Sequence, residues 1–258
     1  MSWLVVNADD GGFASGKDDA ILRCARAGLV RSVSVIANGA TTAAFVLRAA
    51  DRGLDLGVHL NLTEGRPLAG PQRSLTDARG SFPGKAEAWR RAGAGELDAD
   101  EVRREVTAQW ERLAALGVTP THVDGHNHVH LFPAVGAVLA GLAAGLWVRV
   151  PCDPVLPEDL TPMFADWTRE LRGPWKRTDC FVGYGFARDP TAEGFLRCVP
   201  EPARVAEFMV HPGAREGTPF SCSPLRDRET EVLCSPALSR ALEQRGIVLA
   251  SFAEVACA

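Results

Sequence analysis

This 258-residue chain carries 28 lysines and arginines against 32 aspartates and glutamates, a formal net charge of −4. Proteins that bind nucleic acid usually show a basic excess or patch, so we expect no nucleic acid among its partners. Hydrophobic residues make up 46% and charged residues 23%, which is typical of a globular protein with a sizeable core. No repeat, low-complexity tract or linker divides the chain, and we expect one domain over residues 1–258.

The first ten residues, MSWLVVNADD, lack the basic region and cleavage site of a signal peptide. A later stretch, Leu131–Val148, is uncharged and reaches the length of a membrane-span candidate. Pro133 and three glycines interrupt it, so we interpret it as a buried helix, a turn and a strand. Seven scattered cysteines without a CxxC pair favour reduced thiols. We therefore expect a cytoplasmic protein that binds no membrane.

Short apolar runs alternate with amphipathic stretches along the chain. We expect strands, in chain order, at Trp3–Asn7, Ser32–Ile36, Leu54–Leu62, 121–126, 146–151, within 179–186, at 207–213 and at 246–252. We expect helices at Gly16–Leu29, Thr42–Asp51, from Asp98 to Gly117, and at Pro133–Ala144, 191–198 and Pro236–Arg245. Strands that alternate with helices predict a mostly parallel sheet. About seven such units predict an α/β fold, a single-domain irregular (βα) barrel similar to a TIM barrel.

Residues 63–97 break this alternation with a sequence rich in Gly, Pro, Arg and Asp. Long loops inside compact domains are usually functional or disordered. We expect an irregular excursion that forms a lid or a substrate wall, in which Trp89 would offer an aromatic surface; a solvated loop is the alternative. After it, Asp98 is the predicted N-cap of a helix, with Glu101 three residues on.

Polar side chains gather where the predicted strands end. Asp9 and Asp10 end the first strand, and Asp124 and Arg149 lie at the ends of two others. All six histidines fall in or just after predicted strands: His59, His122, His126, His128, His130 and His211. Parallel barrels carry their sites where strands end and βα loops begin. This placement therefore predicts a single site at one end of the barrel.

Two adjacent carboxylates repel each other and are costly to desolvate, a cost that a divalent cation would offset. Carboxylate and imidazole ligands suit zinc and accommodate manganese, iron, cobalt or nickel, whereas magnesium prefers oxygen. One aspartate would bind the metal and the other would take a proton from metal-bound water. In an extended segment His126, His128 and His130 share one face, whereas in a helical turn only the first and third do. At most two of them are expected at one metal.

Each feature also has an ordinary structural explanation. The segment "NADDGG" consists of turn formers, His59 is compatible with a core histidine, "HNHVH" with a surface tract, and His211 with a strand end before a turn. The joint placement of these residues on strand ends favours the metal site.

Several separated motifs resemble those of one known family, in the family's order. They are "VVNADDGG", "GLVRSVSVIANG", "LGVHLNLTEGRPL", "PTHVDGHNHVHLFPAV", "VRVP" and "EFMVHPG". The chain is similar to the YdjC-like carbohydrate deacetylases, which include chitooligosaccharide deacetylases and hopanoid-biosynthesis relatives. The resemblance implies an irregular (βα) barrel that hydrolyses the linear amide of an N-acetylated sugar, with one divalent metal ion, Zn²⁺ or Mg²⁺. A homodimer would be unsurprising for such a barrel.

Carried over by position, the resemblance implies that Asp10, His59 and His126 hold the metal. Asp9 would be the general base, and His211 a candidate acid or oxyanion partner by analogy with other metal-dependent sugar deacetylases.

The resemblance would place His128 and His130 around the ligands or facing the substrate.

This chain departs from the family's usual sequence at one position, and the difference affects the expected shape of the loop. The family usually has phenylalanine after the second aspartate, "NADDFG", where this chain has Gly11. Phe13 follows two residues later.

Two other functions stay open: a metal-dependent hydrolase of another bond (a non-sugar amide or a phosphoester), and a non-catalytic sugar-binding relic. The sequence shows no glycine-rich phosphate loop and no second complete ligand set, which argues against phosphoester cleavage. A relic is expected to have lost its base or a ligand, and all five predicted residues are present.

Overall fold

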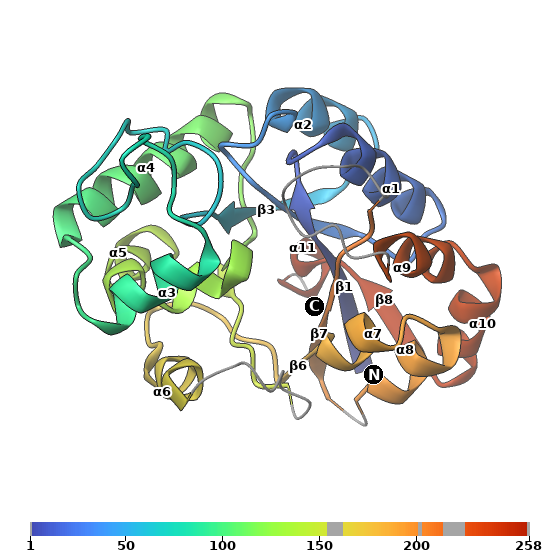
Figure 1. Ribbon diagram of the computed structural model, residues 1–258. Helices are drawn as coiled ribbons and strands as arrows, with labels where there is room; N and C mark the ends of the chain where they lie inside the picture. Colours follow the sequence, from blue (N-terminus) through green and yellow to red (C-terminus); the bar gives the residue numbers. More distant parts are fainter. Residues whose placement is uncertain (1, 154–161, 201–202, 214–224, 257–258) are drawn as a thin grey trace.

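The computed structural model describes residues 2–153, 162–200, 203–213 and 225–256. Within them one sheet has the strand order β5-β4-β3-β2-β1-β7-β6, with β8 paired to β1. Every strand pairing is parallel, and the sheet curls into a half-barrel (Figure 1). The predicted α/β fold, an irregular barrel of parallel strands, is confirmed. The strands are β1 (Ser2–Gly11), β2 (Ser32–Val35), β3 (Asp55–Leu60), β4 (His122–Gly125), β5 (Trp147–Val148), β6 (Cys180–Val182), β7 (Val205–Val210) and β8 (Ile247–Ala250).

The central strand β1 contacts three other strands. It pairs with β7 along Trp3–Ala8 and with β8 along Ser2–Val5. Near its C-terminal end it pairs with β2, from Asn7 to Gly11. Its residues from Leu4 onward are buried, which explains why the apolar run that opens the chain identified it. The strand is longer than predicted, since it continues through both aspartates.

Helices surround the strands (Figure 1). They are α1 (Ser15–Arg26), α2 (Thr42–Ala50), α3 (Lys85–Gly93), α4 (Ala99–Ala115), α5 (Pro133–Leu142), α6 (Pro162–Glu170), α7 (Tyr184–Arg188), α8 (Ala192–Cys198), α9 (Leu225–Leu233), α10 (Pro236–Gln244) and α11 (Phe252–Ala256), with a 3₁₀ helix η1 (His126–Leu131) after β4. The six predicted helices are present to within a few residues. The sequence did not predict α3, α6, α7, α9 or α11, most of which are short.

The predicted cap of α4 is confirmed, but its partner differs. Asp98 accepts hydrogen bonds from the backbone N–H groups of Asp100 and Glu101, both at 3.0 Å. Glu101 does not return to the cap; its carboxylate instead accepts from the N–H and the hydroxyl of Ser74. This acid therefore anchors the preceding segment.

Residues 63–97 are ordered by contacts with α4 rather than irregular throughout. Besides the bonds to Ser74, the buried carboxylate of Glu105 accepts from the N–H groups of Leu68 and Ala69 at 3.1 and 2.8 Å. The segment also contains α3, which carries Trp89. The predicted excursion therefore contains one helix, and long-range bonds supply order that the local sequence does not signal.

The apolar stretch 131–148 divides as expected into the end of η1, the helix α5, a turn and the strand β5. None of the helices within the described ranges is long and apolar enough to cross a membrane. The cysteines that the structure describes are free thiols; Cys222 and Cys257 lie outside the described residues.

We predict that Gly57→Ala destabilises the sheet. A Cβ at position 57 would lie 2.3 Å from Cδ2 of the His122 ring, so the ring must move away from Ser34, whose hydroxyl it contacts at 3.1 Å. Overpacking of this kind typically costs about 1–3 kcal/mol, measurable by urea unfolding. Gly141→Ala is the matched control, because no atom lies within 4 Å of the added Cβ and alanine favours a helix by up to about 1 kcal/mol. Equal effects of the two substitutions would contradict the prediction.

Candidate metal centre

The C-terminal end of β1 supplies two neighbouring carboxylates to one site. Adjacent side chains in a regular strand point to opposite faces, but the register with β2 shifts between Ala8 and Gly11, and Asp10 is left-handed with φ 69°. Asp9 and Asp10 are each only 2% exposed, and both line the same cavity. Strained backbone of this kind clusters at functional sites.

Asp10 lies between two histidines that come from neighbouring strand ends. Its Oδ1 is 2.7 Å from His126 Nδ1 and 3.3 Å from His59 Nε2. The three candidate ligand atoms all lie within 4.8 Å of one another. One carboxylate with two imidazoles is a donor set that suits zinc and other first-row divalent ions. The three residues predicted as ligands thus form a buried group that could hold a metal ion.

The charges in this group depend on one another. Burial alone would raise the pKa of Asp10, but Lys17 and His126 outweigh it and hold that pKa well below its usual value. Lys17 Nζ lies 2.8 Å from Asp10 Oδ2. Burial would lower the pKa of His59, but aspartate charges, Asp124 first, raise it to about 10. The surroundings therefore favour an ionised Asp10 and attract positive charge.

Asp124 on β4 orients His59. Its Oδ1 lies 2.7 Å from His59 Nδ1, and its Oδ2 accepts a hydrogen bond from the Ser34 hydroxyl at 2.8 Å. Because the carboxylate engages Nδ1, the other ring nitrogen faces Asp10. Carboxylates in this position fix the tautomer and raise the basicity of metal-binding histidines.

Arg149, just after β5, joins three buried carboxylates. Its two terminal nitrogens bond the two oxygens of Asp9, each at 2.7 Å, and one of them lies 2.6 Å from Asp124 Oδ2. Its Nε donates to Glu207 on β7 at 2.7 Å. Burial raises the pKa of Glu207 to about 7 despite this partner. Asp9, His59 and Asp124 also lie close enough to share an ion, but Arg149 already bonds both of those aspartates.

His211 directly follows β7 and faces Asp9, with 3.7 Å between its Nε2 and Asp9 Oδ2. Its backbone N–H donates to Glu229 at 2.8 Å, and its carbonyl accepts from Arg226 at 3.3 Å. Two bonds from α9 therefore fix the backbone at His211. The structure places this residue beside the predicted base, as the sequence leads one to expect.

The other two histidines of η1 lie away from the ligand group. The segment is neither extended nor regularly helical, because Asn127 and His128 are left-handed with φ of 52° and 57°. His128 Nε2 contacts the hydroxyl of Tyr184. His130 is fully buried, and burial lowers its pKa to about 3. Of the three, only His126 joins Asp10 and His59.

A cavity of about 230 Å³ opens over this group. Besides the predicted ligands, base and acid, it is lined by side chains of loops, of nearby helices and of the strand β7, among them Glu64, Lys85, Trp89, His128, Tyr184, Met209 and Arg226. Trp89 lines it as predicted for a wall residue, and its indole N–H donates to the Asn127 carbonyl at 3.0 Å.

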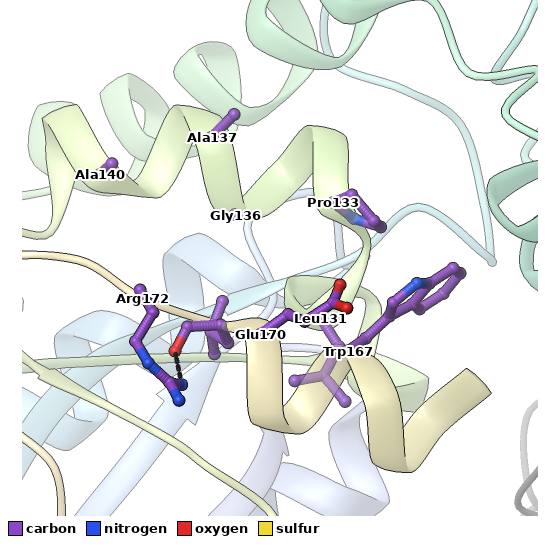
Figure 2. Close-up of a pocket in the computed structure, with 9 residues that line it drawn as sticks. Leu131, Pro133, Gly136, Ala137, Ala140, Trp167, Glu170 and Arg172 are labelled. Carbon is purple, nitrogen blue, oxygen red and sulfur yellow. Dashed lines mark hydrogen bonds between the residues drawn. The ribbon is translucent and has the colours of Figure 1, made fainter. Parts of the chain in front are cut away.

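A second cavity, of about 250 Å³, lies outside the barrel between α5 and α6. Figure 2 shows Ala137 and Ala140 of α5 opposite Trp167 and Glu170 of α6, with Arg172 bonded to the Leu171 carbonyl. Its lining contains no histidine, cysteine or pair of carboxylates. It therefore offers none of the chemistry of the first cavity.

The space beside Gly11 is filled by other side chains. A Cβ there would lie 2.6 Å from Phe45 and 2.8 Å from Val33, so a larger residue would require repacking. Phe13 instead stacks on His126, with 6.2 Å between ring centroids and 19° between planes. An aromatic ring therefore does cover a predicted ligand, although it comes from two positions later.

Three residues of the site escaped prediction. Glu207 is the one charge in the buried strand "VAEFMV", a signal that the sequence does carry. Lys17 lies in the first turn of α1, where the helix dipole disfavours a cation, which is a weaker signal. Glu64 lies in a loop, and nothing in its local pattern distinguishes it.

Comparisons with known proteins identify the family of this chain. The family model described as "YdjC-like protein" matches residues 3–244. The chain is 34% identical to a chitooligosaccharide deacetylase of Yersinia enterocolitica, over 97% of this chain and 98% of that protein. It is 35% identical to a human carbohydrate deacetylase, over 95% of this chain and 88% of that protein. An Enterococcus faecalis crystal structure, of a protein proposed to act in cellobiose-phosphate cleavage, has the same fold, with a TM-score of 0.79 and 24% identity, covering 98% of each chain.

We predict that Arg149→Met lowers the free energy of unfolding by about 3–5 kcal/mol, because three carboxylates stay buried without their shared cation. Urea unfolding measures the loss. Arg48→Met is the control, since Arg48 pairs with Asp19 on the exposed surface and such pairs contribute about 0–1 kcal/mol. A loss no larger than that of the control would refute the prediction.

We predict that Glu229 makes stability fall as pH rises. It is 2% exposed, and burial, only partly opposed by Arg226, raises its pKa from 4.5 to about 7. The folded protein therefore binds more protons than the unfolded chain between these values, and its stability decreases from pH 4.5 to pH 8. Glu229→Gln should remove about 2–3 kcal/mol of that decrease, at about 1.4 kcal/mol per pH unit. Urea unfolding at both pH values tests this, with the exposed Glu111→Gln as control; parallel pH profiles for wild type and Glu229→Gln would count against it.

Proposed function

We propose that this chain, which belongs to the YdjC-like protein family, is a metal-dependent carbohydrate N-deacetylase. It would hydrolyse the acetamide of an N-acetylated sugar to acetate and an amino sugar. One observation carries the proposal. Asp10, His59 and His126 form a buried group that could hold a metal ion, and the next carboxylate along the strand, Asp9, is bonded by Arg149.

Asp10, His59 and His126 would hold one divalent ion. Two imidazoles with one carboxylate favour zinc over magnesium. When bound, the ion would polarise the acetamide carbonyl and make a neighbouring water more acidic.

Asp9 is placed to accept a proton from the attacking water. Asn7 donates to Asp9 Oδ1 at 2.9 Å, and Arg149 bonds both oxygens. Oδ2 therefore has the greater remaining capacity to accept a hydrogen bond, and it is the oxygen that faces His211. The guanidinium fixes the direction of the carboxylate, and general base catalysis requires such positioning.

His211 would give a proton to the leaving amine. Its Nε2 faces Asp9 Oδ2 at 3.7 Å, and it lines the same cavity as the ligand group. A protonated imidazole there could also stabilise negative charge on the acetamide oxygen as the carbonyl is attacked.

The sugar class follows from the relatives, which are named as chitooligosaccharide and carbohydrate deacetylases. The cavity, at about 230 Å³, is smaller than the roughly 300–1,000 Å³ of a drug-sized ligand pocket. We infer that it takes the acetamide and its sugar ring, with the rest of a longer substrate outside. Trp89 and Tyr184 on its wall offer aromatic surface for the apolar face of the ring.

We predict metal-dependent release of acetate from N-acetylated sugars. The panel is N-acetylglucosamine, its disaccharide, and nucleotide- and lipid-linked forms, assayed after chelation and after Zn²⁺ or Mg²⁺ is restored. Asp9→Asn should lower kcat about 10²–10⁴-fold and still bind Zn²⁺, because Asp9 is not in the ligand group. Asp10→Ala should lose both metal and activity.

These variants separate the proposed roles. Acetate release that survives chelation would exclude a metal-dependent reaction. A protein that binds one equivalent of metal but releases acetate from no sugar would point to another bond. Full activity in Asp9→Asn would exclude Asp9 as the base.

A further inference from the structure

We propose that Glu64 is a positioning residue for His126, whose Nδ1 it directs toward the metal site by accepting a hydrogen bond from Nε2. The inference rests on the proposed metal site and adds to it a residue to which neither the family match nor the predicted ligand set gives a role.

The two nitrogens of the His126 ring face two different carboxylates. Nδ1 lies 2.7 Å from Asp10 Oδ1, and Nε2 lies 3.4 Å from Glu64 Oε2. Both Nε2 and Oε2 are buried, and neither has a hydrogen-bond partner within the described residues. The separation is longer than the usual 2.7–3.2 Å, and a small rotation of the Glu64 side chain would shorten it. Each atom is thus the available partner for the other.

Metal binding makes this partner necessary. A neutral imidazole carries one proton, so a ring that presents the Nδ1 lone pair to an ion carries its proton on Nε2. A buried N–H without an acceptor costs free energy. Glu64 supplies that acceptor and so favours the tautomer that can bind.

His59 shows the same arrangement with the nitrogens exchanged. Its Nδ1 lies 2.7 Å from Asp124 and its Nε2 lies 3.3 Å from Asp10. Each of the two histidines therefore has one nitrogen directed at Asp10 and the other at a second carboxylate. Such outer carboxylates typically change metal affinity about 10–100-fold when removed.

The loop that carries Glu64 is held in place by hydrogen bonds. Asn61 donates to the Glu64 carbonyl at 2.8 Å and accepts from its N–H at 3.1 Å. Asn38 donates to the same carbonyl at 3.1 Å. Asn127, the neighbour of His126, donates to the Thr63 hydroxyl at 3.0 Å. The loop and the histidine turn are thus tied together, and the Glu64 side chain, 17% exposed, is directed inward.

Zinc titration of the full-length, chelator-treated protein tests this inference, using competition with a chromophoric chelator and no sugar. Glu64→Ala should raise the Zn²⁺ dissociation constant about 10–100-fold. Glu64→Gln should raise it less, because its amide oxygen still accepts from Nε2. Glu111→Ala, which removes the same charge from the exposed surface of α4, should leave it unchanged. Urea unfolding of the metal-free forms verifies that each variant is folded.

The outcomes separate this inference from the proposed function. A wild-type Zn²⁺ dissociation constant in Glu64→Ala would overturn the inference and leave the deacetylase proposal standing. If the KM for the sugar also rose in that variant, Glu64 would be a sugar contact. Weakened zinc binding in Glu64→Ala supports the inference even if no sugar releases acetate. A wild-type protein that binds no zinc would overturn both.

Discussion

The guanidinium of Arg149 is the interaction on which the rest of the site depends, because it bonds three buried carboxylates from three strands. Removing charges from water is costly even when they are paired, so such a network indicates a function that requires it more than it indicates stability. The same side chain holds Asp9 through two bonds and gives Asp124 a partner besides His59. The proposed base and a proposed metal ligand are thereby positioned together.

The balance of charge around this network explains why two aspartates can be adjacent and buried. Arg149 pairs with Asp9, Asp124 and Glu207, and Lys17 pairs with Asp10, so four carboxyl groups share two cations. The positive charge that is missing is what a divalent ion would supply between Asp10 and two neutral imidazoles. The Lys17 ammonium contacts Asp10 Oδ2, whereas Oδ1 faces the histidines. Oδ1 therefore stays available to an ion.

Local patterns and strand ends predicted the Asp98 cap, the parallel sheet and a single site at the strand ends. The set Asp10, His59 and His126 came from the family resemblance, and the roles of these residues stay predictions until tested. The sequence could not predict features that arise from distant contacts. The order in residues 63–97 depends on carboxylates of α4, such as Glu105. His128 has a left-handed backbone, and its ring contacts Tyr184. Nothing in "HNHVH" predicts this conformation, because the segment is compatible with both an extended and a helical backbone. Lys17 and Glu64 matter because of what lies opposite them in space, which spacing along the chain does not show.

The chemistry and the choice of substrate rest on different parts of the fold. Side chains of the strands bond one another across the sheet: the Ser34 hydroxyl accepts from Asn7 at 2.9 Å and donates to Asp124 at 2.8 Å, and Asp124 bonds His59. These bonds fix the groups relative to the sheet, so the proposed ligands and the proposed base are preorganised, as electrostatic catalysis requires. The cavity wall instead comes largely from loops and short helices, including α3 with Trp89. In the proposed deacetylase, substitutions in that wall would therefore change which sugar fits without disturbing the carboxylates and histidines beneath it.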